Sequence, residues 1–531
     1  MDAPTAENAV VTSYDALPYE SHPYSATHPD HLATMAQLFG MSPPDVDSAR
    51  VLELGCAAGG NLIPMAVAIP GATLLGVDLS KRQLADGWKV IEALGLKNVA
   101  LRHKSILDVG PDDGQFDYIL CHGVFSWVSR EVQEKIFDIC DKQLSTNGVA
   151  YISYNTNPGW YLRGMVRQMM CFHARQFEDP QSQIQQARAL LDFLINAGSA
   201  GDETYHALLR RELEIIRGRR DSYLYHEHLE DVNDPLFFFE FVERAEKHNL
   251  RYLAESQFSE MVAANCGSHV DKTLRELNAG LIHTEQYLDF LRNRTFRRTL
   301  LCRHEITPQR QIGRRQLSGL FVGTDLRPDE GELNLSSFEE LSFRSGGGPT
   351  VTVTKPIHKA ALLGLGRIYP EMVKFDELSS FAHNEMGKVL VRDAEGHQQD
   401  LGDLAGLVLE LFAKDLIALQ NRPPRYATKP GDRPAASPLA VHQAVAGEQY
   451  VTTLAHGMMQ LNDLTKRLLP LLDGTRDRKT LCEFLEGLAA DGTIVIEQYG
   501  VRQDAKQRPE LLERLLDQEL QSLARNGVLL G

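Results

Sequence analysis

The sequence has few cysteines and no cysteine pair. Seven cysteines occur in 531 residues, at positions 56, 121, 140, 171, 266, 302 and 482, and none is spaced as Cys-x-x-Cys. Neither a disulfide framework nor a zinc site is therefore indicated, and we predict no metal site.

Long hydrophobic runs are also missing. The sequence has no apolar run of 18 residues, and its first 15 residues hold neither a basic region nor an apolar segment. Those features mark membrane-spanning helices and signal peptides. We therefore expect no membrane insertion and a cytoplasmic location.

An excess of positive charge is absent as well. The chain has 55 Lys and Arg against 71 Asp and Glu, a formal net charge of −16. Binding to nucleic-acid phosphates needs clustered Lys and Arg, so we expect no nucleic-acid partner. For the one basic segment, residues 292–303, the sequence favours a solvated or interfacial helix face.

The first 160 residues alternate strand-like and helix-like segments. We predict strands over residues 51–55, 73–77, 99–103, 118–121 and 149–154, and helices between them, such as 81–94 and 131–144. Nearly all-apolar strands separated by helices are typical of a parallel sheet that is covered on both faces. The predicted fold class is therefore α/β, with a Rossmann-like first domain.

The rest of the chain has a different pattern. Long amphipathic helices are predicted over residues 184–196, 204–218 and 237–248, and strands over 319–323 and 350–354. Residues 421–438 contain five prolines, which favours a linker. We expect a first domain over 1–162, a helical regulatory or dimerisation region over 163–302, a mixed α+β domain over 303–420, the linker, and a helical domain over 439–531.

The loop after the first predicted strand carries the strongest motif, Glu53-Leu54-Gly55-Cys56-Ala57-Ala58-Gly59-Gly60-Asn61. Its glycines allow a sharp turn and close approach of a ligand, but their spacing is not the GxGxxG of a dinucleotide site. Glu53 would repel a pyrophosphate, so a cationic ligand suits the loop better. Asp78 ends the second strand about 20 residues later, where a carboxylate accepts hydrogen bonds from a ribose diol.

These two motifs resemble class I S-adenosylmethionine-dependent methyltransferases. A tight turn with a helix cap is the structural alternative. The sequence departs from the family at Ala57, where glycine is usual. The resemblance implies S-adenosylmethionine as cofactor and a set of cofactor-binding positions after the first four strands: Glu53, Gly55, Cys56, Ala57, Gly59, Asn61, Asp78, Leu79, Ser105, Ile106, Cys121 and His122.

A second set of motifs is rich in aromatic and polar residues. It comprises residues 14–21 and 27–29 before the first strand, 122–128 after the fourth, and 154–160 after the fifth. Such a rim suits a sulfonium and an approaching ammonium, although packing of a lid is the alternative for any single residue. The candidate catalytic residues are Tyr14, Tyr19, His28, His122, Trp127, Tyr154 and Trp160.

The whole set resembles bacterial methyltransferases with a methyltransferase regulatory domain, including rickettsial-type protein lysine methyltransferases. The resemblance extends to Tyr225-His226-Glu227-x-Leu229-Glu230, Asn293-Arg294-x-Phe296-Arg297-x-Thr299-Leu300-Leu301 and, weakly, Leu471-Leu472-Asp473-Gly474-Thr475-Arg476. It implies methylation of lysines in protein substrates such as outer-membrane or surface proteins, and a homodimer. By analogy the last domain could be a winged helix.

Phe237, Phe238, Phe239 and Phe241 also favour a homodimer, because they cannot all face one core stripe of a single helix. Two other functions remain open at this point. The chain could methylate a small molecule or a non-lysine acceptor, or it could be a non-catalytic module that binds S-adenosylmethionine as a regulatory ligand.

Overall fold

A computed structural model describes residues 21–197, 203–277, 280–329, 333–346, 348–387, 394–494, 497–498, 501–502 and 509–531. The chain divides into two compact units. The first comprises residues 1–22, 48–62 and 73–307, and the second comprises residues 23–47, 63–72 and 308–531.

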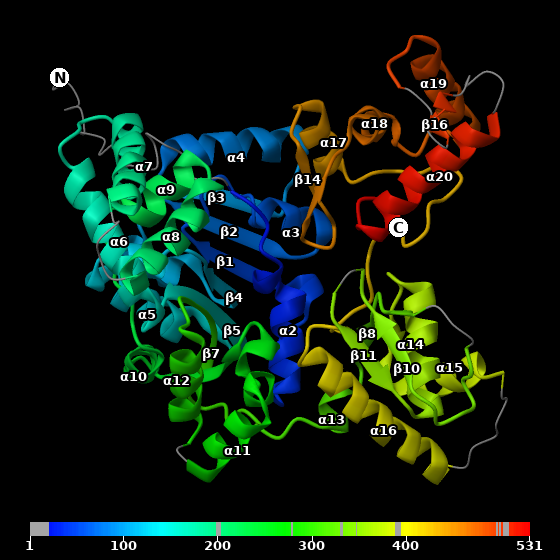
Figure 1. Cartoon of the computed structure of the whole chain (residues 1–531), viewed down its shortest axis with the longest axis horizontal. Coiled ribbons are helices and arrows are strands. Elements are labelled where there is room, and N and C mark those ends of the chain that lie inside the picture. The colour runs from blue at the N-terminus through cyan, green and yellow to red at the C-terminus, as the bar shows by residue number, and fades with distance from the viewer. Residues whose placement is uncertain are drawn as a thin grey trace. The chain divides into compact units, whose positions relative to one another are not determined.

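The first unit is built on a seven-stranded sheet with the order β3-β2-β1-β4-β5-β7-β6 (Figure 1). Its first five strands run parallel, while β7 is antiparallel to both β5 and β6. The strands are β1 Arg50–Leu54, β2 Thr73–Asp78, β3 Val99–His103, β4 Phe116–Cys121, β5 Leu144–Asn155, β6 Leu250–Glu255 and β7 Phe296–Arg303. The strand order reverses between β1 and β4, the point at which open α/β sheets bind ligands.

The predicted α/β fold is confirmed. Four residues of β1 and five of β4 are buried, and all but Glu53 are apolar or aromatic, as expected of central parallel strands. The predicted helices over 81–94 and 131–144 correspond to α4 Lys81–Ala93 and α5 Arg130–Gln143. Ser80 and Ser129 cap these two helices, each accepting a hydrogen bond from a backbone N–H of the first turn.

The prediction for residues 163–302 missed two strands. The helices are present, but β6 lies among them, β7 follows the last of them, and both strands join the sheet. The basic segment 292–303, predicted as a helix face, is mostly strand β7, so that prediction is wrong. Arg297 in this strand is completely buried and neutralised by carboxylates distant in sequence, which no local pattern reveals.

Helices complete the first unit. A second small core joins α6 to α9, with Val166, Met170, Leu191, Leu213 and Leu224 among its buried residues. Nine helices of the described part belong here: α4, α5, α6 Gly159–Ala174, α7 Pro180–Ala197, α8 Glu203–Arg217, α9 Asp221–His228, α10 Phe238–Lys247, α11 Ser268–Leu277 and α12 Leu281–Arg292. Helix α3, Leu62–Ala68, follows the loop after β1.

The second unit contains small sheets and helices. One sheet has the order β11-β10-β9 and another β12-β8-β13, and two hairpins follow. The strands are β8 Phe321–Gly323, β9 Arg327–Pro328, β10 Leu341–Arg344, β11 Thr350–Val353, β12 Val373–Lys374, β13 Ala418–Gln420, β14 Tyr450–Thr452, β15 Met458–Gln460, β16 Glu497–Gln498 and β17 Val501–Arg502. The helices are α2 Pro29–Leu38, α13 Arg314–Leu317, α14 Pro356–Ile368, α15 Leu378–Glu385, α16 Ala394–Phe412, α17 Pro438–Val445, α18 Asp463–Leu468, α19 Arg478–Ala490 and α20 Pro509–Arg525.

The predicted linker over 421–438 is not a free spacer. The backbone N–H of Ala427 donates to Leu529 (2.9 Å), and that of Ser437 donates to Val528 (2.8 Å). Near its start, Arg422 forms an ion pair with Asp30 (3.3 Å). The prolines prevent regular structure here, but the extended backbone pairs with the C-terminal residues.

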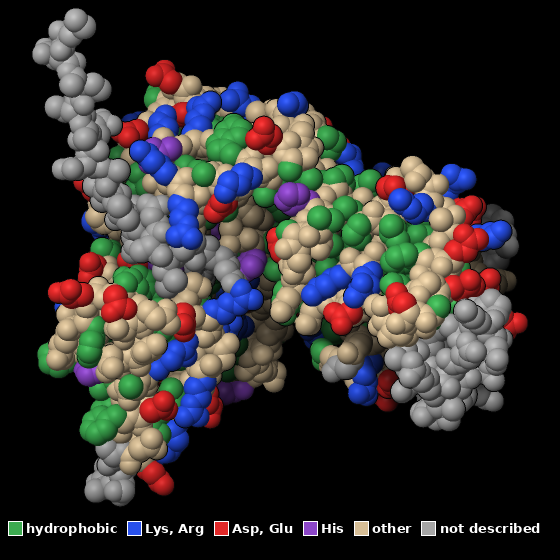
Figure 2. Space-filling model, turned by 90° about the horizontal axis from the view of Figure 1, so that it is seen from above, with side chains coloured by type: hydrophobic (Ala, Val, Ile, Leu, Met, Phe, Trp, Pro, Cys, Tyr) green, Lys and Arg blue, Asp and Glu red, His purple; other side chains and the backbone are tan. Residues whose placement is uncertain are grey.

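Two surface properties bear on the sequence predictions. No helix among the described residues is long and apolar enough to cross a membrane. Figure 2 shows Lys and Arg side chains interspersed with Asp and Glu side chains over one face of the protein.

Candidate functional site

The loop after β1 has an unusual backbone. Gly55 and Gly59 have φ angles of 76° and 73°, and Ala57 between them has a φ of 50°. A Cβ atom on Gly55 would lie 2.4 Å from Val124 Cγ2, so glycine is required there by space as well as by conformation. Ala57 adopts this left-handed conformation without being glycine, a local strain of the kind that collects at ligand sites.

Asp78 holds the loop in this shape. Its Oδ2 accepts a hydrogen bond from the backbone N–H of Ala57 (2.8 Å), and its Oδ1 accepts one from Ser80 (2.8 Å). An ionised carboxylate has about four acceptor positions, so one side chain can hold a loop and also accept from a ligand. Asp78 therefore both supports the loop and presents acceptors at the end of β2.

Glu53 lies beneath the loop and is buried. Its Oε1 accepts a hydrogen bond from Asn61 Nδ2 (2.7 Å), while Oε2 is buried with no hydrogen-bond partner in the described part of the chain. Burial raises the pKa of Glu53 to about 7, with a smaller contribution from the charge of Asp78. A buried carboxylate oxygen that lacks a donor is suited to a cationic ligand.

The N-terminal segment reaches this loop at Ser21. The Ser21 hydroxyl accepts a hydrogen bond from the backbone N–H of Gly60 (2.8 Å), and a Cβ on Gly60 would lie 2.2 Å from the Ser21 carbonyl oxygen. Tyr14 and Tyr19 lie outside the described residues.

His28 belongs to the second unit rather than to the loop. It is the N-cap of α2, where its Nδ1 accepts a hydrogen bond from the backbone N–H of Asp30 (3.2 Å). Its ring lies 5.0 Å from that of His456, and burial lowers the pKa of both. Its contacts in this unit are those of a helix cap, so the structure gives no support to His28 as a catalytic group.

The remaining predicted cofactor positions follow β2, β3 and β4. Leu79 is exposed, the Ser105 hydroxyl accepts from the backbone N–H of Leu107 (3.2 Å), and Ile106 packs on the main core. Cys56 and Cys121 are buried, and burial raises the pKa of both thiols. Neutral buried thiols are poor nucleophiles, so these cysteines contribute shape and main-chain groups.

His122 lies at the end of β4 among residues that the sequence did not single out. Its Nδ1 lies 2.9 Å from the Tyr151 hydroxyl and 3.3 Å from Ser153 Oγ, and its ring meets Phe296 edge-on at 6.1 Å. Burial lowers the pKa of His122 to about 3, and the charge of Arg298 adds to the effect. The imidazole is therefore neutral at physiological pH.

Tyr151 and Ser153 alternate with the apolar Ala150 and Ile152 in β5, a signal that could have been read from the sequence. Phe296 and Arg298 could not have been found in this way, because they come from β7.

The three other predicted catalytic residues have different environments. Trp127 is half-buried and meets the buried Trp160 edge-on at 6.0 Å. Tyr154 is completely buried, stacks on Phe241 at 4.1 Å, and places its hydroxyl 3.2 Å from Thr299. Tyr154 thus belongs to the core, which contradicts its prediction as a catalytic group, because a substrate would have no access to its hydroxyl.

Among the described residues, no group of three His, Cys, Asp or Glu side chains is arranged to hold a metal ion.

Three family descriptions match this chain. Residues 51–148 match a methyltransferase domain, residues 220–303 a predicted methyltransferase regulatory domain, and residues 432–528 a PKMT C-terminal winged helix domain. The solved structure of PKMT2 from Rickettsia typhi in complex with AdoHcy is similar over 97% of this chain and 100% of that chain, with a TM-score of 0.85 and 32% identity. The chain belongs to this family of S-adenosylmethionine-dependent methyltransferases.

Two proteins of Rickettsia prowazekii are also similar to this chain. An uncharacterised protein of Rickettsia prowazekii is 36% identical over 526 residues, covering 97% of this chain and 93% of the relative. A second protein from that organism is 43% identical over 241 residues, 45% of this chain and 96% of the relative. The cofactor is S-adenosylmethionine, whose product AdoHcy is bound in the Rickettsia typhi structure.

The regulatory domain match covers β6 and β7, the two strands that the sequence analysis missed. The regulatory domain match ends at Arg303, the last residue of β7, and includes β6. This part of the chain therefore completes the methyltransferase sheet. The third match, over residues 432–528, is to a winged helix domain, the module that the sequence suggested by analogy.

Proposed function

We propose that this methyltransferase transfers the methyl group of S-adenosylmethionine to the ε-amino groups of lysines in protein substrates. The observation that carries the proposal is the similarity to PKMT2 along nearly the whole chain, together with the PKMT-type winged helix domain. Outer-membrane or surface proteins are the proposed substrate class, on the resemblance to rickettsial protein lysine methyltransferases.

The residues around the loop fit the cofactor. Asp78 would accept hydrogen bonds from the ribose, and the backbone of Gly55–Gly59 would lie against the ligand. Glu53 would attract its positive charge through the oxygen that has no donor. When bound, S-adenosylmethionine supplies an electrophilic methyl group on a sulfonium, so these residues need only hold the cofactor and orient its methyl group.

Arg298 lies near His122, where we propose that the acceptor lysine approaches. A lysine must be neutral to attack, and the charge of Arg298, which already lowers the pKa of His122, would also disfavour an ammonium beside it. His122 is too weak a base, at a pKa of about 3, to take the proton at neutral pH. We therefore assign it a hydrogen-bonding role, with the proton leaving to solvent.

The pH dependence of cofactor binding tests the role of Glu53. Its pKa of about 7 means that it ionises as pH rises, and the ionised form attracts the cationic cofactor. Affinity should therefore tighten by up to ~10-fold between pH 6 and pH 8. Calorimetry with Glu53→Gln is the matched control, since the α-amino group of the ligand still titrates there. Identical pH profiles for both proteins would remove Glu53 from the site.

The acceptor is tested with a lysine-rich protein extract and the same extract with its amines acetylated. The enzyme and isotopically labelled cofactor should label only the first, because the nitrogen of an acetylated lysine is an amide and is no longer a nucleophile. Equal incorporation would rule out lysine. Labelling of metabolites but of neither extract would identify a small-molecule methyltransferase.

We also propose a homodimer. Phe238 and Phe241 are buried in the core. Five other aromatic side chains form a continuous surface, in which the centroids of neighbouring rings lie 5.7–6.2 Å apart. Tyr161 is 61% exposed and Phe290 47% exposed on it. Apolar surface of this kind is typical of an interface between subunits. The aromatic surface comprises Tyr161, Phe237, Phe239, Tyr287 and Phe290.

Light scattering should give twice the 59.3 kDa chain mass for the wild type. Phe290→Glu should shift this toward the monomer, because a charge would be buried in the interface. Phe338→Glu is the control, since Phe338 is 75% exposed but lies in the second unit. A monomeric wild type at micromolar concentration would refute the homodimer.

A further inference from the structure

The first unit contains a cavity of about 420 Å³ that the cofactor loop does not use. It lies between α6, α8 and the start of β7, and its volume falls in the range of ligand pockets. Two of its lining residues, Phe296 and Arg298, also face His122 at the end of β4. Phe296 pairs with Asn155, the last residue of β5. The cavity therefore borders the strand ends where an acceptor would approach.

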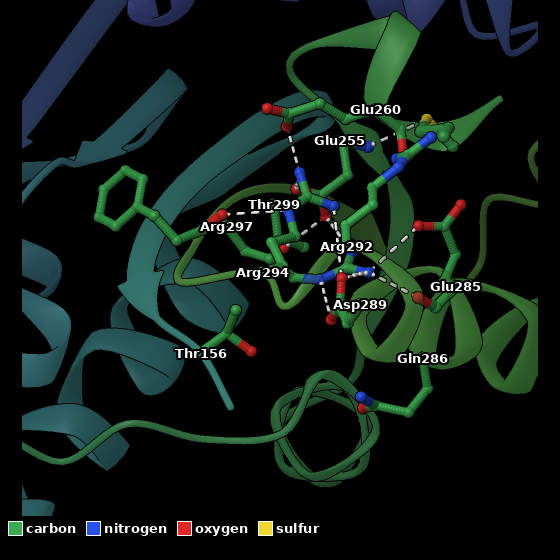
Figure 3. Close-up of polar contacts among 12 residues, drawn as sticks. Thr156, Glu255, Glu260, Glu285, Gln286, Asp289, Arg292, Arg294, Arg297 and Thr299 are labelled. Atoms are coloured by element: carbon green, nitrogen blue, oxygen red, sulfur yellow. Dashed lines mark hydrogen bonds and ion pairs between the residues drawn. The ribbon is translucent and has the colours of Figure 1, made fainter. Parts of the chain in front are cut away.

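The charged side chains that line this cavity are mostly arginines, although the chain as a whole is acidic. Two glutamates, Glu212 and Glu260, face five arginines in the lining: Arg163, Arg211, Arg292, Arg294 and Arg298. The acids are largely occupied, since Glu260 pairs with Arg294 and with Arg298 (2.7 Å), and Glu212 lies 3.7 Å from Arg163. Glu255, Glu285 and Asp289 surround Arg297 (Figure 3), and Glu255 and Asp289 also lie 3.4 Å and 3.6 Å from Arg294. These acids therefore offset the charges of Arg294 and Arg297, but they form no ion pair with Arg211 or Arg292.

Two of the arginines lack a carboxylate partner within the described chain. Arg292 donates to the carbonyl oxygens of Glu260 and Val262 and to Cys266 Sγ. Arg211 makes no hydrogen bond or ion pair with another described residue, and it lies on the exposed side of α8. Planar guanidinium groups bind carboxylates and phosphates through paired hydrogen bonds.

We propose that this cavity binds the carboxylate of an aspartate or glutamate close to the target lysine in the protein substrate. A carboxylate fits better than a phosphate, because Glu212 and Glu260 in the lining would repel a dianion more strongly than a single charge. The inference rests on the proposed protein lysine methylation. It adds a preference for lysines in acidic surroundings.

Mapping of methylated sites tests the proposal. A denatured bacterial lysate is incubated with enzyme and labelled cofactor, and modified lysines are located by mass spectrometry. With the wild type, Asp and Glu should be enriched several-fold near modified lysines, relative to all lysines in the lysate. Arg211→Gln should lose most of this enrichment while still methylating lysines. Arg210→Gln, which removes the adjacent charge outside the cavity, should keep it.

The outcomes separate the two proposals. Lysine methylation without acidic enrichment, or with equal enrichment in both variants, overturns the cavity proposal and leaves the proposed function intact. Enrichment next to phosphorylated residues instead overturns the choice of a carboxylate. Absence of methylated lysines overturns both.

Discussion

Replacing Arg297 by methionine should lower the free energy of unfolding of the first unit by about 3–5 kcal/mol. Arg297 is completely buried, with Glu255 at 2.7 Å, Asp289 at 2.8 Å and Glu285 at 3.2 Å, and it lies 3.8 Å from the centre of the Phe238 ring. Methionine has an unbranched apolar side chain that fills part of the same space, but it carries no charge. The buried carboxylates would lose their main counter-ion, which costs far more than the lost contacts alone.

The loss should depend on pH. Burial acts to raise the pKa of Glu255, but the charges of Arg297 and Arg294 outweigh it and hold that pKa below its usual value. Without Arg297 the pKa of Glu255 would rise, so the folded variant would bind more protons than the unfolded chain. Its stability should then fall as pH rises from 5 to 8.

Denaturant unfolding followed by tryptophan fluorescence provides the measurement. The three tryptophans, Trp88, Trp127 and Trp160, all belong to the first unit, so the signal reports on that unit. Arg275→Met is the control, because Arg275 forms an exposed ion pair with Asp271 and should cost less than ~1 kcal/mol. A similar small loss for Arg297→Met would show that the buried network does not depend on it.

Replacing Asp78 by alanine should weaken cofactor binding about 100-fold, equivalent to about 2.7 kcal/mol. The variant loses the hydrogen bond from Ala57 in the loop, the one from Ser80 at the start of α4, and the acceptors proposed for the ribose. Asp78→Asn should be nearly as weak, because one side of an amide would direct its N–H groups at a backbone donor.

Calorimetric titration with S-adenosylmethionine measures this loss. Asp86→Ala is the matched control, because it removes the same charge from the exposed face of α4 and should leave the affinity within twofold. A parallel melting curve separates lost binding from lost folding. Unchanged affinity in Asp78→Ala would show that the end of β2 does not contact the cofactor.

The geometry of the proposed cofactor site was predictable because its determinants are local. The loop from Glu53 to Asn61 follows an apolar strand, and its glycines are where the backbone needs positive φ or close approach. Asp78 ends the next strand, and parallel neighbours bring their carboxyl ends to one edge of the sheet. Even Ala57, the departure from the family pattern, was visible in the sequence, although its strained conformation was not.

The surroundings of the proposed acceptor site were not predictable, because its residues come together through distant pairing. Tyr154 looked like a rim residue until the structure placed it against Phe241, and Arg298 looked like part of a solvated helix. Likewise, five prolines suggested a linker that instead pairs with the C-terminal residues.

By itself, then, the sequence determined the α/β sheet, the glycine-rich loop after β1 and the family, because hydrophobic periodicity and glycine chemistry act over a few residues. Only the tertiary structure decided that β6 and β7 complete the sheet and that Arg297 is buried. A strand's partner and a charge's counter-ion lie far away along the chain, and burial of an arginine is stable only once those carboxylates surround it.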